Sequence, residues 1–204
     1  MCPVFCCVTY AFAMKLSITN DEINALPLHA FAGRINVIDD AEELPSAFKE
    51  ISKHKVVGFD TETKPVFVKG QRHFVALMQV ALPDTVYLIR IKLTGITPEI
   101  IQFLENDQIL KAGVGVRDDI KALQILKKFT AAGFVELADM SRNAGLEVES
   151  VKKLTALLLG FRISKSAQTS NWEAEKLDAK QVSYAATDAW VCLNIYRKLL
   201  GDLP

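Results

Sequence analysis

The stretch that decides the fold is VVGFDTET, residues 56–63. It runs apolar for four residues and then places Asp60 and Glu62 one residue apart. On a strand, side chains two positions apart project from the same face, so both carboxylates would point the same way. Like charges side by side repel, and burial strengthens the repulsion. A strand here therefore needs a partner that makes the two acids tolerable.

The composition is that of one globular domain. The chain has 204 residues, of which 50% are hydrophobic and 24% charged, enough to bury a substantial core. Lys plus Arg and Asp plus Glu both number 24, so the whole chain carries no charge signature for a polyanion. Nucleic-acid binding would need a local basic rim around an acidic centre. No apolar run approaches the roughly 20 residues that span a bilayer, so no membrane partner is expected.

Residues 1–13, MCPVFCCVTYAFA, are expected to be a leader outside the domain. They end in a small-residue pattern, as signal peptides do, but lack the positive charge that precedes one. Met14 reads like a second start, which favours a disordered leader or a mis-assigned start and a single domain over residues 14–204. The chain has no CxxC pair, and Cys192 stands alone in an apolar helical pattern, so neither a disulfide framework nor a zinc site is indicated. We expect a reducing, cytoplasmic environment.

The hydrophobic patterns predict a β-meander followed by alternating helices and strands. Strands are expected over 35–39, 53–63, 75–82, 85–91, 109–116 and 134–140, and helices over 41–52, 97–107, 118–129, 148–160 and 178–200. Pro83 and Asp84 predict a tight hairpin connection, and Gly160 ends a helix. Asp178 with Gln181 predicts a capping box at the start of the last helix. The order indicates an α/β fold with a mixed sheet flanked by helices.

Asp188 falls on the apolar arc of the last predicted helix. At about 100° per residue, Tyr184 precedes it by one turn, and Val191 and Ile195 follow it on the same side. An ionised carboxylate among apolar neighbours is expensive unless it is paired or coordinates a metal. Taken alone, Asp188 fits a helix cap or a salt bridge equally well.

The same periodicity separates Asp118 from Asp119. On the helix DDIKALQILKKF, Asp119 lies near the centre of the apolar direction, whereas Asp118 lies to the side. Asp119 is therefore expected to point inwards, and Asp118 to serve as a helix N-terminal charge.

Acids at apolar positions thus occur in three segments. Four converging carboxylates with no His or Cys ligand pattern suit Mg²⁺ or Mn²⁺. Two such ions about 4 Å apart activate a water and stabilise the leaving oxygen of a phosphodiester. Without metal, the pair Asp60 and Glu62 should bind a proton more readily than ordinary acids do.

Three motifs in this order resemble those of the DEDDy 3′-5′ exonucleases: VVGFDTET, KAGVGVRDDIKAL (111–123) and YAATDAW (184–190). That family has a ribonuclease H-like fold and includes ribonuclease D and the exonuclease domain of the Werner syndrome helicase. The form GVGV-x-x-D and the stretch SNWE (170–173) are more similar to the Werner-like branch. The resemblance spans about Ile35 to Leu200, nearly the whole chain after the leader.

The resemblance implies a nuclease site and its substrate. In the family, the acids that match Asp60, Glu62, Asp119 and Asp188 hold two divalent ions. The tyrosine that matches Tyr184 orients or helps to deprotonate the attacking water. Such enzymes release nucleoside 5′-monophosphates from a 3′ end, here expected on single-stranded or 3′-recessed DNA or RNA.

Nucleic-acid contacts are expected around the acids. Candidates for phosphate and strand contacts are Lys64, Lys69, Arg72, His73 and Lys165, and for each of them a solvated surface position is the alternative. Leu77, Met78 and Gln79 would line the floor or wedge between terminal bases. Trp172 would stack on a base or, the favoured alternative, pack the loop beneath it.

Two other functions share parts of this pattern. The same fold could serve as a catalytically weak nucleic-acid-binding module, which the presence of all four acids and the tyrosine disfavours. FDTET also approximates the DxDxT motif of haloacid-dehalogenase-type phosphatases. That family has its later acids at strand ends, whereas Asp119 and Asp188 are predicted on helices.

Overall fold

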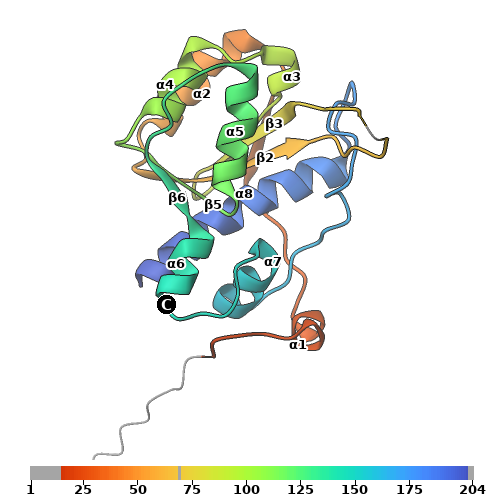
Figure 1. Cartoon of the computed structure of the whole chain (residues 1–204), viewed down its shortest axis with the longest axis vertical. Helices are drawn as coiled ribbons and strands as arrows, with labels where there is room; N and C mark the ends of the chain where they lie inside the picture. The colour runs from red at the N-terminus through yellow and green to blue at the C-terminus, as the bar shows by residue number, and fades with distance from the viewer. Residues whose placement is uncertain (1–14, 69, 202–204) are drawn as a thin grey trace, which may run out of the picture.

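A mixed sheet forms the centre of the molecule. The computed structural model describes residues 15–68 and 70–201, and within them six strands pair in the order β1-β4-β3-β2-β5-β6 (Figure 1). The pairs β2–β3 and β3–β4 are antiparallel, whereas β1–β4, β2–β5 and β5–β6 are parallel. The predicted mixed sheet is therefore confirmed, and VVGFDTET forms its β2.

The elements have the following bounds. The strands are β1 (Arg34–Ile38), β2 (Val56–Thr63), β3 (Val75–Ala81), β4 (Thr85–Ile89), β5 (Leu110–Gly113) and β6 (Phe134–Glu136). The helices are α1 (Asn20–Ala25), α2 (Leu44–Ile51), α3 (Ile91–Thr94), α4 (Pro98–Glu105), α5 (Val116–Leu126), α6 (Leu137–Asn143), α7 (Val151–Leu154) and α8 (Ala179–Leu200). A 3₁₀ turn (Ala41–Glu43) precedes α2, and a π-helical turn (Thr155–Leu159) follows α7.

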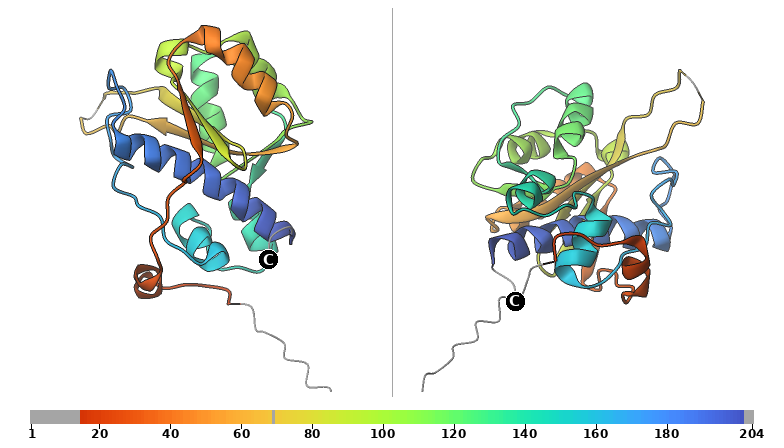
Figure 2. Two further views of the ribbon diagram at one scale, coloured as in Figure 1. Left: turned by 180° about the vertical axis from the view of Figure 1, so that it is seen from behind. Right: turned by 60° about the horizontal axis from the view of Figure 1, so that its bottom comes forward.

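Helices cover both faces of the sheet. On one face α2, α4 and α5 pack on the strands, and on the other α8 crosses the sheet, with α1, α6 and α7 beyond it (Figures 1 and 2). β2 alternates between these layers. Val57 and Phe59 belong to the core under α2 and α4, so Gly58 and Asp60 face α8.

Gly58 allows α8 to lie directly on the central strand. A Cβ at this position would overlap the backbone oxygen of Ala189 on α8. Ala185 and Ala189 are fully buried on the same side of the helix. Because small residues meet on both surfaces, the helix backbone comes close to the sheet. This contact places Asp188 beside Asp60.

Several predicted boundaries are confirmed. In the capping box of α8, Gln181 N donates to Asp178 Oδ1 at 2.8 Å and Asp178 N donates to Gln181 Oε1 at 3.0 Å. The hairpin connection closes with a hydrogen bond of 2.8 Å from Leu82 N to Thr85 O. Gly160 ends the preceding helical segment with a φ of +74°.

Some predicted elements were wrong. The strand predicted over 134–140 stops at Glu136, whose side chain accepts from the backbone of α6 and starts a helix there. The segment 148–160 is helical as predicted, but its second half winds as a π-helical turn. Neither α1 nor α3 was predicted, and α3 begins at the last residue of the expected strand 85–91.

Within the two described ranges, no helix is long and apolar enough to cross a membrane. The expected leader over residues 1–13 and the second start at Met14 lie outside the described residues.

Gly58→Ala should lower the free energy of unfolding by at least about 3 kcal/mol, because the added methyl meets helix backbone that cannot move aside alone. Urea denaturation followed by circular dichroism measures the loss. Gly70→Ala is the control, since its Cβ would have no neighbour within 4 Å. Because Gly70 has a positive φ, the substitution should cost only the backbone strain of an alanine there, about 1–2 kcal/mol of the free energy of unfolding. Equal losses in the two variants would contradict the close helix–strand contact.

Candidate active site

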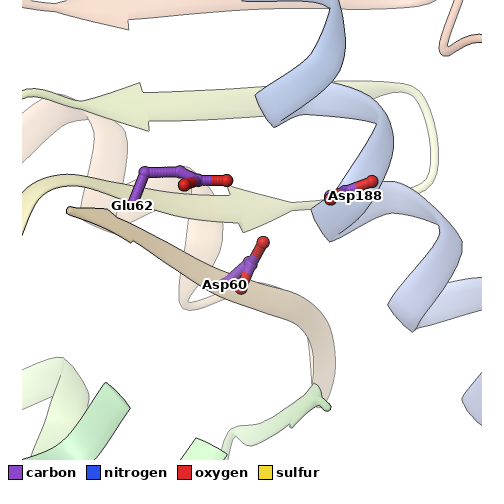
Figure 3. Close-up of side chains that lie close together, drawn as sticks. All are labelled: Asp60, Glu62 and Asp188. Carbon is purple, nitrogen blue, oxygen red and sulfur yellow. The ribbon is translucent and has the colours of Figure 1, made fainter. Parts of the chain in front are cut away.

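Three carboxylates from two elements far apart in the sequence, β2 and α8, lie close together. Asp60 and Glu62 project from β2 and Asp188 from α8, and each offers an oxygen within 4.8 Å of the others. Figure 3 shows the three side chains converging between the strand and the helix. Glu62 and Asp188 are only 9% and 6% exposed. The structure therefore brings together three of the four predicted acids.

Burial raises the pKa of all three carboxyl groups. The pKa of Asp60 lies well above its ordinary value because burial disfavours the charged form, and neighbouring carboxylates, Asp119 foremost, add to the effect. Burial likewise raises the pKa of Glu62 to about 8 and that of Asp188 to about 6. The predicted readiness to bind a proton is confirmed. Its main cause is desolvation, however, and not the repulsion between Asp60 and Glu62.

Asp119 approaches from the edge of β2. Among the described residues, β5 pairs with β2 only as far as Gly58, and α5 contacts the strand beyond. There Asp119 Oδ1 accepts a hydrogen bond from Thr61 Oγ1 at 2.5 Å. Burial raises the pKa of Asp119 to about 6, against the lowering effect of that hydrogen bond. Asp119 thus lies outside the group of three, although its charge acts on Asp60.

The neighbouring acid Asp118 points away from the site, as the helical periodicity predicted. Its side chain is 86% exposed and pairs with Lys121 at 2.9 Å. Asp118 is therefore a solvated helix residue.

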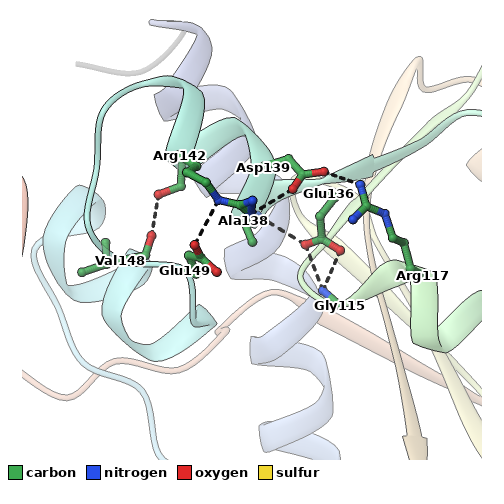
Figure 4. A network of polar contacts seen from close by, with 9 residues as sticks. Gly115, Arg117, Glu136, Ala138, Asp139, Arg142, Val148 and Glu149 are labelled. Carbon is green, nitrogen blue, oxygen red and sulfur yellow. Dashed lines mark hydrogen bonds and ion pairs between the residues drawn. The ribbon is translucent and has the colours of Figure 1, made fainter.

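A polar network fixes the start of α5 (Figure 4). Gly115 N donates to both carboxylate oxygens of Glu136, at 2.9 and 3.0 Å. Arg117 and Arg142 both donate to the carboxylate of Asp139, at 2.6 and 3.0 Å. The network ties the first turn of α5, which carries the inward-pointing acid, to β6 and α6.

Tyr184 is buried one turn before Asp188 on α8. Burial and the charges of Asp188 and Glu62 raise the pKa of its hydroxyl. Its hydrogen bond in turn lowers the pKa of Asp188, against the effect of burial. The Trp172 ring packs beside it, with ring centroids 6.0 Å apart. Tyr184 therefore presents a protonated hydroxyl to the carboxylates.

The donor set fits a hard divalent cation. In the described ranges, none of the four acids forms an ion pair with a basic side chain. Oδ1 of Asp188 is buried without a hydrogen-bond partner there. Buried carboxylates in this state are costly unless a cation balances them, and clustered oxygens suit Mg²⁺ or Mn²⁺. The cluster therefore fits a divalent metal ion.

Two of the predicted basic contact residues, Lys165 and Arg72, lie on exposed loops. Lys165 is exposed, and its charge lowers the pKa of both Glu62 and Asp188, against the effect of burial. Arg72 is exposed in the β2–β3 loop. This loop projects beside the loop before α8 (Figures 1 and 2).

Glu173 joins these two loops. Its carboxylate contacts His73 Nδ1 at 2.9 Å and Lys64 Nζ at 3.9 Å. His73 and Lys64 are thus held near the site by an acid, and a phosphate would compete with that acid for them. The predicted residue Lys69 lies outside the described residues.

The predicted base contacts of three apolar residues do not fit the structure. Leu77 and Met78 have no exposed surface, because β3 is an inner strand covered on both faces. Trp172 is also fully buried and packs on Tyr184, as the alternative of loop packing predicted. Contact of any of the three with a base would require the fold to open.

Sequence reasoning missed two residues that support the site. Thr61 holds Asp119, and its place between two acids on a strand, hence on the opposite face, was the available signal. Arg90 is fully buried and donates to the backbone oxygens of Ala174 and Glu175, the latter at 2.7 Å. It anchors the loop before α8, and a lone Arg in the apolar run TVYLIRI was its signal.

Without metal, the folded protein should lose stability as the pH rises from about 4.5 to about 8. Glu62 has an ordinary pKa of 4.5, raised to about 8 by folding. In this window the folded state holds a proton that the unfolded state has released, so its stabilising effect is complete below the window and lost above it. Urea denaturation in chelator at about pH 5.5 and about pH 8.5 measures the change.

Variants isolate the contribution of Glu62. Glu62→Gln should flatten the pH dependence, whereas Asp118→Asn, which alters an exposed acid, should leave it unchanged. A Glu62→Gln slope equal to that of the unaltered chain would contradict the raised pKa.

Comparison with known proteins identifies the family. A family model described as 3′-5′ exonuclease matches residues 35–204. The bifunctional 3′-5′ exonuclease/ATP-dependent helicase WRN of Mus musculus is 35% identical over 191 residues, which cover 87% of this chain and 14% of that protein. Exonuclease 3′-5′ domain-containing protein 2 of Drosophila melanogaster is 32% identical over 180 residues, covering 83% of this chain and 30% of that protein. The chain thus spans less than a third of these two relatives.

Solved structures share the fold. The EXO domain of Aedes aegypti Nibbler superposes with a TM-score of 0.75 at 24% identity, covering 86% of this chain and 92% of that one. Escherichia coli RNase D gives a TM-score of 0.75 at 19% identity, covering 83% and 45%. These likenesses confirm the predicted ribonuclease H-like fold. Since the family model covers most of the chain and the three motifs agree with it, the chain belongs to the DEDDy-type 3′-5′ exonuclease family.

Proposed function

We propose that this chain is a metal-dependent 3′-5′ exonuclease that hydrolyses phosphodiester bonds at nucleic-acid 3′ ends and releases nucleoside 5′-monophosphates. The observation that carries the proposal is the convergence of Asp60, Glu62 and Asp188 in a buried site without a basic ion-pair partner in the described ranges. Membership of the family supports the reaction.

Two ions, Mg²⁺ or Mn²⁺, would be held by Asp60, Glu62, Asp119 and Asp188. Asp60 lies within reach of the charges of both Asp119 and Asp188. The ions supply positive charge that stabilises the developing charge of the phosphodiester and lowers the pKa of a water. The sole use of oxygen donors favours these hard cations over zinc.

Tyr184 would orient the attacking water. Its raised pKa keeps the hydroxyl protonated, so it serves as a hydrogen-bonding group and not as a base in the metal-free protein. The buried ring of Trp172 beside it would limit its movement.

The substrate would be single-stranded or 3′-recessed DNA or RNA. Lys64, Arg72, His73 and Lys165 would contact its phosphates, because these side chains lie around the acids or on the loop that follows β2. A formal net charge of zero supports modest binding that weakens with salt. We also propose a cytoplasmic location, since Cys192 is a free, buried thiol.

The alternative functions are less well supported. A non-catalytic binding module would not need four acids in a buried site, where they destabilise the fold. For a haloacid-dehalogenase-type phosphatase, Asp119 and Asp188 would be needed at strand ends, but they lie on α5 and α8.

Asp188→Ala should lower the hydrolysis rate by at least about 10³-fold, because several kcal/mol of charge stabilisation is lost with the metal ligand. The assay uses 5′-labelled single- and double-stranded DNA and RNA with Mg²⁺ or Mn²⁺, and follows a ladder that shortens from the 3′ end. Chelator should abolish the ladder, and Asp118→Asn should leave it unchanged.

The same assay separates the alternatives. Removal of a terminal phosphate alone would favour the phosphatase. Binding without cleavage would favour the binding module. Full cleavage by Asp188→Ala would refute the role of this acid.

Tyr184→Phe should lower the rate by about 100-fold even at saturating Mn²⁺, because the hydroxyl that orients the water is removed. The loss of its hydrogen bond to Asp188 should in addition weaken metal binding. Single-turnover kinetics and Mn²⁺ calorimetry measure the two properties. Tyr196→Phe, a buried tyrosine on the same helix, is the matched control and should retain full activity. Equal activity of Tyr184→Phe and the unaltered chain would refute the role.

A further inference from the structure

Gln79 is a polar side chain in an otherwise apolar strand. β3 has the sequence VALMQVA, and Gln79 is fully buried near its middle. Within the described part of the chain, neither Oε1 nor Nε2 of its amide has a hydrogen-bond partner. A buried amide in this state destabilises a fold, and an apolar side chain of similar size would remove the penalty. Gln79 therefore calls for a reason other than stability.

Gln79 lies directly opposite the first acid of the site. It is the Cα partner of Asp60 in the antiparallel ladder of β2 and β3. Residues opposite each other project to the same face, with Cβ atoms about 4.5–5.5 Å apart. Leu77 and Glu62 form the next pair on that face. The amide consequently lies beside the β2 acids, on the face of the sheet that α8 covers. This helix carries Asp188.

The carboxylates near Gln79 receive few hydrogen bonds in the described ranges. Oδ1 of Asp188 is buried and unpaired in the described ranges. Asp119 receives a hydrogen bond from Thr61, and Asp188 one from Tyr184. For Asp60, the hydrogen bond that acts on its pKa comes from the backbone of Thr61. No side-chain donor to Asp60 is found in the described ranges, although the charges of three other acids act on it, namely those of Asp119, Asp188 and Glu62.

A neutral amide suits a position beside such an acid. A carboxylate that ligates a cation is oriented by donors to its remaining lone pairs. Lys or Arg would donate strongly, but its charge would oppose the cation. The amide of Gln79 offers two N–H groups without charge.

We propose that Gln79 is a positioning residue, whose Nε2 donates to the carboxylate of Asp60 when the acids are ionised and so orients it for cation binding. Gln79 touches neither substrate nor reacting atoms. The inference rests on the proposed function for the class of ligand, a divalent cation, but it can be tested without nuclease activity.

Gln79→Met removes the donor while keeping the length and approximate volume of the side chain. The Kd for Mn²⁺, measured by calorimetry on the full chain, should rise about 10- to 100-fold. In chelator, the Tm of the variant should equal or exceed that of the unaltered chain, because an unpaired buried amide has been replaced by an apolar group. A purely structural role would give the opposite result, a lower Tm with an unchanged Kd.

Two further variants complete the test. Gln79→Leu is a second apolar replacement should the first fail to fold. Val80→Ala is the matched control, because Val80 is buried on the opposite face of the same strand, in the core under α2 and α4. It should lower the Tm and leave the Kd unchanged.

Kinetics give an independent measurement. In Gln79→Met, kcat should fall at limiting Mn²⁺ and recover at saturating Mn²⁺, with the KM for an oligonucleotide unchanged. An unaltered Mn²⁺ affinity in the Gln79 variants would overturn the positioning role alone. Failure of the unaltered chain to bind Mn²⁺ would instead overturn the proposed function.

Discussion

At Gly58 the backbone of α8 rests on the central strand with no side chain between them. The place of Asp188 in the site follows from this contact. A long, capped helix is laid across β2, and its register against the strand sets Asp188 beside Asp60 and Glu62. A larger residue at position 58 would lift the helix and separate the acids. The contact therefore links packing directly to chemistry, because the same small residues that let the layers close also bring the carboxylates together.

The molecule treats its other buried charges differently. Lys111 is buried in β5, but its ammonium donates to the backbone oxygens of Phe103 and Asn106 at 3.1 and 2.6 Å. Buried Arg90 likewise donates to backbone oxygens of the loop before α8. Lys111 is satisfied by the fold itself, which is the usual condition for a buried charge. Arg90 is largely so, because a terminal nitrogen also pairs with Asp39 at 3.7 Å, although its buried Nε has no partner in the described ranges. The acid cluster has little such compensation, so a bound cation would lower the free energy of the folded protein. This contrast between structural and functional charges supports a metal site more strongly than the acids do alone.

Much of the fold and of the acid set could be predicted from the sequence, because periodicity reports which face of an element is buried. It placed Asp119 inwards and Asp118 outwards, and capping chemistry gave the start of α8. The rest depends on tertiary contacts. Residues 137–140 are helical because Glu136 caps α6, which local patterns did not reveal. Sequence could not show that Leu77, Met78 and Trp172 are covered on every side, since apolar residues fit a core and a base-binding surface equally well. The support that Thr61 gives Asp119 spans 58 positions of the chain.

We expect the carboxylates gathered by the contact of α8 with β2 to form a divalent cation site. A crystal of the unaltered chain grown with Mn²⁺ tests this most directly, since anomalous scattering locates the ion independently of any assay. We expect an anomalous peak coordinated by Asp60, Glu62 and Asp188, with Asp119 turned towards the same centre. The absence of a peak there at saturating Mn²⁺, or a peak bound only by exposed acids such as Asp118, would contradict it.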